Sequence, residues 1–205
     1  QVAIADVAEI VEPSSSIDKE ALSRGTSIYF PKRVIPMLPE EISNNLCSLI
    51  PNEDRNVLVC KMNFTQEGEI NSYDFSESII NSHKRFTYNE VEFLNQNKDI
   101  NLSADILNSI NALEKLTQQL LHNRSKRYAL EIESSEPSLS FGNEGSILEI
   151  FIPKRLFAHQ MIEEAMISAN ICADKFIKKH SGFGVYRIHE EPEHLNFKNL
   201  NKFFS

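Results

Sequence analysis

The sequence TSIYFPKRVIPMLPEEISNNLCSL, residues 26–49, is the most constrained part of this chain. Three prolines, Pro31, Pro36 and Pro39, fix the backbone angle φ at their positions and stiffen the segment. Pro39 also suits the first position of a helix, and Pro51 would end that helix. The apolar spacing predicts a short, half-buried helix with Ile42, Leu46 and Leu49 on its inner face. We therefore expect a rigid turn that leads into a small helix.

The composition is that of an ordinary globular protein, with 41% hydrophobic and 24% charged residues among 205. This length suffices for one domain or for a large piece of a bigger one. No stretch approaches the roughly 18 uninterrupted apolar residues that cross a bilayer, and no basic segment precedes an apolar one at the start. We expect a cytoplasmic protein with no membrane segment. Because the opening QVAIADV is typical of a buried strand, we also expect an excised piece of a longer chain.

The charged residues and the cysteines limit the possible functions. The net charge of −8 argues against a free-standing nucleic-acid binder, since Lys and Arg supply most of the nonspecific affinity for phosphates. It does not exclude an enzyme that draws a strand into a local channel. Cys47, Cys60 and Cys172 lie singly in apolar patterns, which predicts reduced, buried thiols.

The hydrophobic patterns predict an α+β fold in which a mixed or antiparallel sheet with hairpins packs against several helices. The long C-terminal helix is expected to bury one apolar stripe: Ala158, Ile162, Ala165, Ala169, Cys172, Ala173 and Phe176. We predict one unit made of a strand from residue 2 to about 11, helices at 16–23, 89–94, 103–122 and 154–179, hairpins at 56–80 and 138–152, and a strand at 183–189.

Sequence motifs for familiar chemistries are missing. The chain has no G-x-G-x-x-G, G-x-x-x-x-G-K-[ST], G-x-S-x-G or H-E-x-x-H. The segment HEEPEH, residues 189–194, gathers two imidazoles and three carboxylates, which would suit a metal in an unrelated cytosolic enzyme. A solvated acidic loop is the commoner explanation, because no second pair of ligands has a supporting spacing.

Two groups of side chains have both a structural and a functional explanation. On the long helix, Glu163, Asn170 and Asp174 lie within about 40° of one another, either on a solvated face or presented to a ligand. Tyr29, beside Pro31, and Tyr88, in HKRFTYNEV, also have two possible roles. Rigid aromatics next to cations suit stacking on nucleobases, whereas most tyrosines pack in the core and hydrogen-bond their hydroxyls.

Five blocks in the same order resemble the catalytic domain of the ribonuclease II / ribonuclease R family: VAIADV, LSRGTSIYFPKRVIPMLPEEISNNLCSL, SHKRFTYNEV, IEEAMISANICADKFI and FGVYRIHEEP. The resemblance implies a processive 3′-to-5′ hydrolytic exoribonuclease that releases 5′-nucleoside monophosphates from single-stranded RNA. In that family the proline-rich turn helps to line a narrow RNA channel. YRIH is similar to the ribonuclease R branch and EEAMISANICA to the ribonuclease II branch, so the branch stays open.

The resemblance assigns roles to individual residues. Tyr29 and Tyr88 match two tyrosines that hold the 3′-terminal nucleotides, and Glu163 matches a functional glutamate that supports catalysis. A stacking phenylalanine of the family falls at Ile132 in this sequence, so the contact is either missing or supplied by Phe141 nearby.

The family's principal catalytic groups fall outside this sequence. Its magnesium-binding aspartates lie before VAIADV, and its catalytic arginine lies after RIHEEP. Residues 1–205 thus resemble a partial domain, and Asp6 is the one candidate for approaching the Mg²⁺, although a structural role at a strand end is as common. Because two-metal hydrolysis needs the whole ligand set, we expect the chain alone to be inactive. The alternative function is a non-catalytic RNA-binding or interaction module.

Overall fold

The computed structural model describes residues 1–96, 102–127, 137–142, 145–188, 190 and 202. The chain divides into two compact units, residues 1–172 and residues 173–205. The first unit contains every strand of the described chain and most of the helices. Helices and antiparallel strands alternate along it, which confirms the predicted α+β fold.

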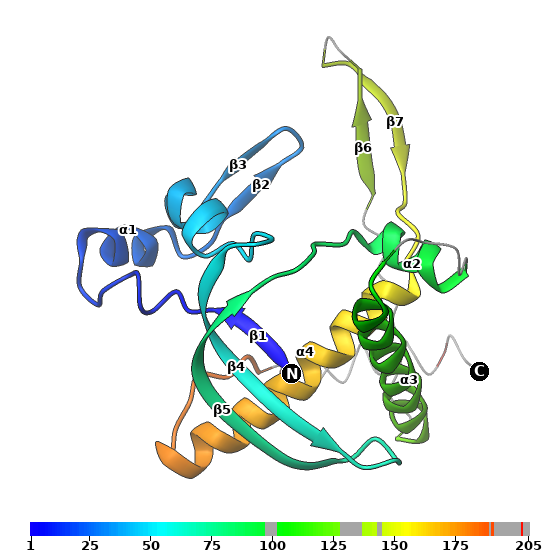
Figure 1. Cartoon of the computed structure of the whole chain (residues 1–205). Coiled ribbons are helices and arrows are strands. Elements are labelled where there is room, and N and C mark those ends of the chain that lie inside the picture. The colour runs from blue at the N-terminus through cyan, green and yellow to red at the C-terminus, as the bar shows by residue number, and fades with distance from the viewer. Residues whose placement is uncertain (97–101, 128–136, 143–144, 189, 191–201, 203–205) are drawn as a thin grey trace. The chain divides into compact units, whose positions relative to one another are not determined.

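A three-stranded antiparallel sheet in the order β1-β4-β5 organises the first unit. The strands are β1 (Val2–Ala5), β4 (Asp54–Phe64) and β5 (Ile70–Asn81). Their register places Val2 opposite Cys60 and Cys60 opposite Phe75. The β4–β5 hairpin is long and strongly curved (Figure 1). Its tight turn requires a glycine at Gly68, where φ is +78° and an added Cβ would lie 2.7 Å from Gln119 Cγ.

Two smaller hairpins complete the strands. The predicted rigid turn forms β2 (Ile28–Phe30) and β3 (Arg33–Ile35), joined by the two residues Pro31 and Lys32. The second hairpin pairs β6 (Ser138–Phe141) with β7 (Ile147–Phe151), as predicted. Hydrophobic residues on β7 are exposed, with Leu148 and Ile150 each about two-thirds accessible to solvent.

The helices begin and end close to the predicted positions. They are α1 (Ser16–Arg24), α2 (Tyr88–Gln96), α3 (Ala104–Lys126) and α4 (Phe157–His180). Ser15 caps α1 by accepting a hydrogen bond from Asp18 N, and Gly25 ends it in the left-handed conformation. The helix after the prolines is a short π-helix, η1 (Glu41–Leu46), in which Cys47 N donates to Ile42 O across five residues.

The centre of the core lies where α4 packs on the sheet. Cys60 of β4 and Cys172 of α4 are buried there, surrounded by Met62, Tyr73 and Phe75. Burial, together with the neighbouring Cys172 thiol, raises the pKa of Cys60 to about 11. All three cysteines are free thiols, as predicted, but only Cys60 and Cys172 are buried, and Cys47 is half-buried.

The predicted buried stripe of α4 was partly wrong. Ala158, Ala169 and Cys172 are buried, but Ile162 is 42% exposed, and Met161, Glu164 and Ser168 occupy the buried face instead. Hydrophobic periodicity missed this face because two of its members are polar. On β4, Val57 and Val59 are buried while Leu58 between them is exposed.

Two predicted strands are also corrected. The first strand ends at Ala5 rather than near residue 11, because Asp6 N makes the last bond to Asn56 O and the chain then turns, with Ile10 N donating to Val7 O. Residues 183–188 form no strand. There the chain leaves α4 through Gly182, whose φ is +73°.

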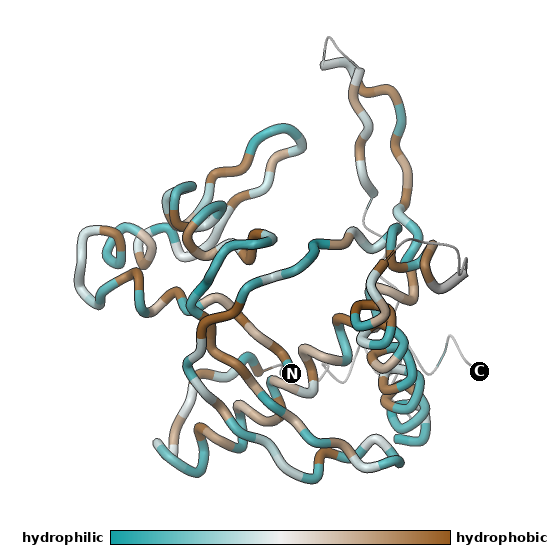
Figure 2. The backbone as a smooth tube through the Cα atoms, in the orientation of Figure 1, coloured by the Kyte–Doolittle hydropathy of each residue, from teal (hydrophilic) through white to brown (hydrophobic). Residues whose placement is uncertain are grey.

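Figure 2 shows hydrophobic residues along β4 and β5 where these paired strands overlap in the view, and mixed hydropathy along the helices. None of the helices in the described ranges is long and apolar enough to span a membrane.

Candidate functional site

Tyr88 is the first residue of α2, and a reciprocal capping arrangement fixes this end of the helix. Glu90 N donates to Thr87 Oγ1 over 3.2 Å, while Thr87 N donates to Glu90 Oε2 over 2.6 Å. The backbone and hydroxyl of Thr87 lower the pKa of the Glu90 carboxyl by hydrogen bonding to its charged form. The backbone that carries Tyr88 is therefore held at a defined start of the helix.

The ring of Tyr88 stacks on the ring of His159 in the first turn of α4. The ring centroids are 4.0 Å apart and the planes are inclined by 21°. His159 Nδ1 accepts a hydrogen bond from Leu156 N over 3.1 Å, so the imidazole also caps its own helix. Glu92 of α2 accepts a longer bond, 3.4 Å, from Ala158 N. The first turns of α2 and α4 are thereby joined, and Tyr88 remains 45% exposed.

Glu163 follows His159 by one helical turn on α4 and lies between two arginines. Arg155 Nη2 is 2.5 Å from Glu163 Oε2, and Arg124 Nη1 of α3 is 3.3 Å from Oε1. Partial burial raises the pKa of Glu163, but the hydrogen bonds and charges of Arg155 and Arg124 outweigh it and lower the pKa overall. Arg124 also binds the buried Glu164 at 2.8 Å. Glu163 is thus a half-buried, charged carboxylate with fixed partners.

Residues four apart on a helix lie on the same side, so His159 and Glu163 share one face of α4. Through His159, the structure brings two of the predicted site residues, Tyr88 and Glu163, to the first turns of the same helix. Glu163 was assigned either to a solvated face or to a ligand-binding face. Its two arginine partners distinguish it from Asn170, which is exposed.

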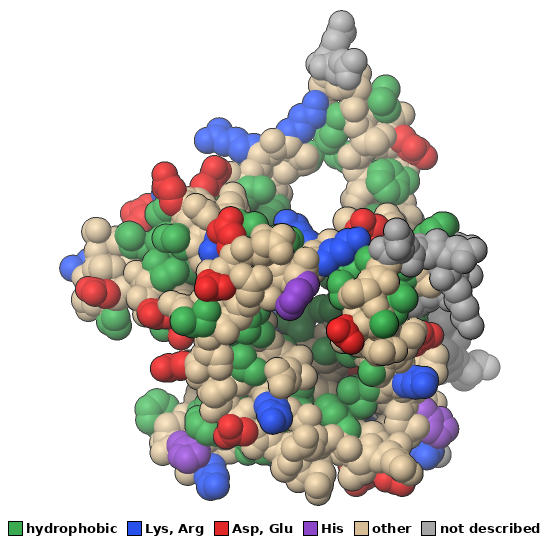
Figure 3. Space-filling model, viewed as in Figure 1, with side chains coloured by type: hydrophobic (Ala, Val, Ile, Leu, Met, Phe, Trp, Pro, Cys, Tyr) green, Lys and Arg blue, Asp and Glu red, His purple; other side chains and the backbone are tan. Residues whose placement is uncertain are grey.

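Tyr29 lies on β2, opposite Val34, with 77% of its surface exposed. The loop that follows it reaches the second hairpin, where Lys32 Nζ lies 4.6 Å from the centre of the Phe141 ring. Basic side chains are visible at the tip of the β2–β3 hairpin in Figure 3. The candidate stacking residue Phe141 therefore already has a cation over its ring. Ile132, the position that the family resemblance gives to phenylalanine, lies outside the described residues.

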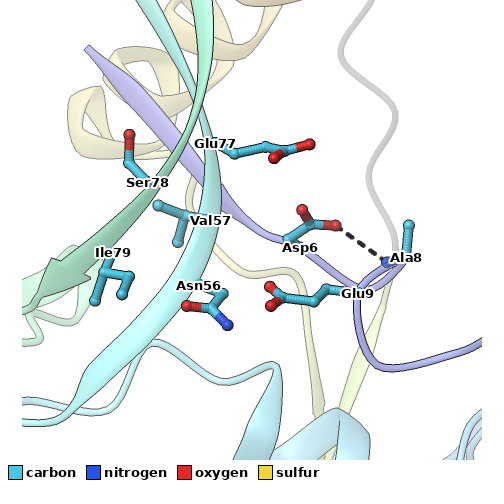
Figure 4. A pocket seen from close by; sticks show the side chains of 8 residues that line it. All are labelled: Asp6, Ala8, Glu9, Asn56, Val57, Glu77, Ser78 and Ile79. Carbon is cyan, nitrogen blue, oxygen red and sulfur yellow. Dashed lines mark hydrogen bonds between the residues drawn. The ribbon is translucent and has the colours of Figure 1, made fainter.

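Asp6 lies at the end of β1, and its side chain faces a hollow of about 560 Å³ (Figure 4). Asp6 Oδ1 accepts a hydrogen bond from Ala8 N over 3.1 Å, which is the bond of a structural turn. Glu9 and Glu77 also line the hollow. Within the described ranges, however, no group of three His, Cys, Asp or Glu side chains is placed to hold a metal ion. Most of HEEPEH, including both histidines, lies outside the described residues.

The sequence predictions missed His159, Arg124 and Arg155. The sequence carries a signal for one of them, because Arg124 belongs to a basic cluster at the end of α3. A capping box, T-x-x-E at residues 87–90, also marks the start of the helix that carries Tyr88. A single histidine at the start of an amphipathic helix carries no comparable signal, so the partner of Tyr88 had to come from the structure.

Comparison with known proteins first defines the class of fold. The structure of ribonuclease R from Mycoplasma genitalium in complex with ribose methylated single-stranded RNA superposes with a TM-score of 0.89 and 32% identity, covering 98% of this chain and 31% of that one. The structural match confirms the helix and antiparallel-sheet architecture of a ribonuclease R domain.

The sequence comparisons then define the family. The model of the RNB domain matches residues 1–205. Ribonuclease R of Vibrio parahaemolyticus is 40% identical over 206 residues, covering all of this chain and 25% of the relative, and that of Escherichia coli is 42% identical over 193 residues, covering 93% and 24%. This chain belongs to the RNB family, as the motifs predicted. It spans about a quarter of the length of these relatives.

Proposed function

We propose that this chain is part of a 3′-to-5′ hydrolytic exoribonuclease that degrades single-stranded RNA to 5′-nucleoside monophosphates. The observation that carries the proposal is the paired presentation of Tyr88 and Glu163 at the start of α4, in a chain of the RNB family. The structure of ribonuclease R from Mycoplasma genitalium, which has the same fold, contains bound ribose methylated single-stranded RNA. The proposed enzyme acts in the cytoplasm.

The proposed roles follow from the chemistry of each side chain. Tyr88 offers its exposed ring to a base near the 3′ end of the strand, a contact worth about 1–3 kcal/mol per base. Tyr29 offers a second ring from β2. Glu163, kept charged by Arg124 and Arg155, accepts hydrogen bonds from the hydroxyl groups of the terminal ribose and thereby supports catalysis.

The proposed hydrolysis depends on a divalent metal, Mg²⁺, which would activate water and neutralise charge on the phosphate. The described residues do not form a metal site by themselves. Asp6 is a single candidate ligand, and the principal ligands are expected from outside this sequence. The chain by itself is therefore expected to be inactive, and the activity belongs to the longer protein.

A second candidate function is a non-catalytic module that binds RNA. The exposed tyrosines support this candidate as well, because aromatic rings can stack on bases without hydrolysis. Such a module would bind single-stranded RNA in a salt-sensitive manner and release no product.

The test is magnesium-dependent release of nucleoside monophosphates from single-stranded RNA, carrying an internal label at every nucleotide, by the full-length gene product and by this chain. We expect stepwise release from the 3′ end by the full-length protein and none by the chain. Glu163→Gln should slow release, whereas Glu12→Gln, an exposed acid of the loop before α1, should not. RNA binding without product from the full-length protein would contradict the enzyme and favour the binding module.

A further inference from the structure

We propose that His159 is a positioning residue that holds Tyr88 in the orientation needed to stack on an RNA base. The inference rests on the proposed function, because it assigns His159 a role through Tyr88. Its basis is the stacked pair of rings at 4.0 Å and 21°, together with the hydrogen bonds that fix the His159 ring to α4 and the first turn of α2 below Tyr88.

The imidazole has a single defined orientation. Its Nδ1 accepts the bond from Leu156 N, so the proton of the neutral ring lies on Nε2. His159 N donates to Leu156 O as well, over 3.1 Å, which closes the first turn of α4. Rotation of the ring about χ2 would break the bond to Leu156 N and leave that amide without this partner. His159 is therefore a fixed surface rather than a mobile side chain.

The backbone under Tyr88 is fixed independently. Thr87 and Glu90 cap α2, and Glu92 of the same helix reaches the first turn of α4 through Ala158 N. The ring of Tyr88 consequently meets His159 along one face. Because 45% of the residue is exposed, part of Tyr88 remains accessible to a base.

This arrangement reduces the cost of ordering Tyr88 when RNA binds. A free tyrosine on a helix end samples several rotamers, and a base that stacks on it must select one of them. The His159 ring makes that selection in advance. Loss of the ring should therefore weaken binding even though His159 itself makes no contact with the base.

The charged residues near His159 come from three helices and from the segment before α4. Glu163 lies one turn further along α4, Arg155 precedes the helix, and Glu92 of α2 faces the same turn. Arg124 of α3 reaches Glu163 as well. The proposal requires no change of protonation among them, because the imidazole already makes the hydrogen bond and the stack.

The experiment is a double-mutant cycle in the full-length protein, measured with single-stranded RNA that carries 2-aminopurine at the 3′-terminal base. His159→Ala should raise KM about threefold to tenfold and reduce the fluorescence quenching of the bound base, with a smaller change in kcat. In the Tyr88→Ala background, His159→Ala should have almost no further effect. His122→Ala, an exposed histidine of α3, serves as the control.

Two further variants separate the stack from the cap. His159→Phe keeps an aromatic ring for Tyr88 and loses the bond to Leu156 N, so it should restore most of the quenching. His159→Asn keeps a side-chain oxygen for the cap and loses the ring, so it should behave like His159→Ala. Because both retain part of the local structure, they remain informative if His159→Ala does not fold.

The outcomes distinguish the inference from the proposed function. If Tyr88→Ala weakens RNA binding while His159→Ala does not, His159 plays no positioning role and the function stands. If the two substitutions add fully, His159 contacts RNA directly and the inference is wrong. If the full-length protein neither binds nor degrades the RNA, the proposed function fails, and the inference fails with it.

Discussion

The two tyrosines proposed to bind RNA, Tyr29 and Tyr88, are presented in contrasting ways. Tyr88 stands at the start of a capped helix with its ring on His159, whereas Tyr29 stands on a three-residue strand of a two-stranded hairpin, with 77% of its surface exposed. The hairpin contacts β6 through the cation–π interaction of Lys32 with the ring of Phe141. Both tyrosines match the family motifs, but they differ in preorganisation. Tyr88 is oriented before a ligand binds, whereas Tyr29 is expected to become oriented on binding.

The largest expected effect tests the ion pair between Arg124 of α3 and Glu164 of α4, the helix on which Tyr88 stacks. Arg124→Ala leaves the carboxylate of Glu164, whose side chain is only 6% exposed, without its 2.8 Å partner. Breaking such a pair should lower the free energy of unfolding by about 3 kcal/mol, measured by urea denaturation. Arg155→Ala is the matched control, because its partner Glu163 is 37% exposed and the loss should stay below about 1 kcal/mol. Equal losses would show that Glu164 is not the residue that makes Arg124 important.

The next effect compares the tyrosines directly. Tyr88→Ala should weaken binding of single-stranded RNA by the full-length protein about tenfold to hundredfold. Tyr29→Ala should weaken it less, about threefold to tenfold, because an unsupported ring must be ordered on binding. Fluorescence anisotropy at fixed salt gives both values. Phe30→Ala, the next residue of β2, is the control for damage to the hairpin. A larger loss at Tyr29 would reverse the comparison, and no loss there would remove Tyr29 from the site.

A smaller effect concerns the contact between the hairpins. Lys32→Ala removes the cation over Phe141, an interaction worth about 0.5–1 kcal/mol at an exposed site. Amide hydrogen exchange in β2 and β3 should accelerate about twofold to fivefold, since the tip loses its attachment. Lys32→Arg keeps a cation and should leave the exchange rates unchanged. Acceleration confined to β4 and β5 would contradict the assignment of Lys32 to this contact.

The smallest effect is a pH dependence at the α2 cap. The folded-state pKa of Glu90 lies below its ordinary value of 4.5, so its charged form stabilises the fold. This contribution is complete above the unfolded-state pKa and disappears as the pH falls through the lowered folded-state pKa. The melting temperature of Glu90→Gln should therefore lie below that of the wild type at pH 7 and approach it at pH 3. If the difference in melting temperature persists at pH 3, the effect comes from the shape of the Glu90 side chain rather than from its charge.

Turns and helix ends that are determined by neighbouring residues were predictable from the sequence. The hairpin turns, the Gly25 and Gly182 helix ends and the start of α3 follow from residues that are adjacent in the chain. The motif T-x-x-E likewise marks the start of α2, although we predicted this helix one residue later. Such signals act over three or four residues and depend little on the rest of the fold.

The pairings that complete the candidate site were not predictable in this way. The sequence analysis did not identify Glu164 as buried, because its partner Arg124 lies on another helix. His159 looked like an isolated histidine until α2 placed Tyr88 on it. In both cases a side chain derives its role from a partner that is distant in sequence, and a single sequence contains no record of that contact. The family resemblance identified Tyr88 and Glu163 but gave no information about what supports them.

The two buried thiols provide an internal reporter of how firmly α4 is attached. Cys60 lies on the sheet and Cys172 on the helix, and a thiol with a pKa of about 11 is almost wholly protonated near neutrality. Only the thiolate reacts with an alkylating probe, so modification at these positions requires α4 to separate from the sheet. Cys47, which is half-buried on a different segment, supplies the reference rate. The ratio of the rates would measure the transient opening of the helix that carries both His159 and Glu163, without any substitution in the chain.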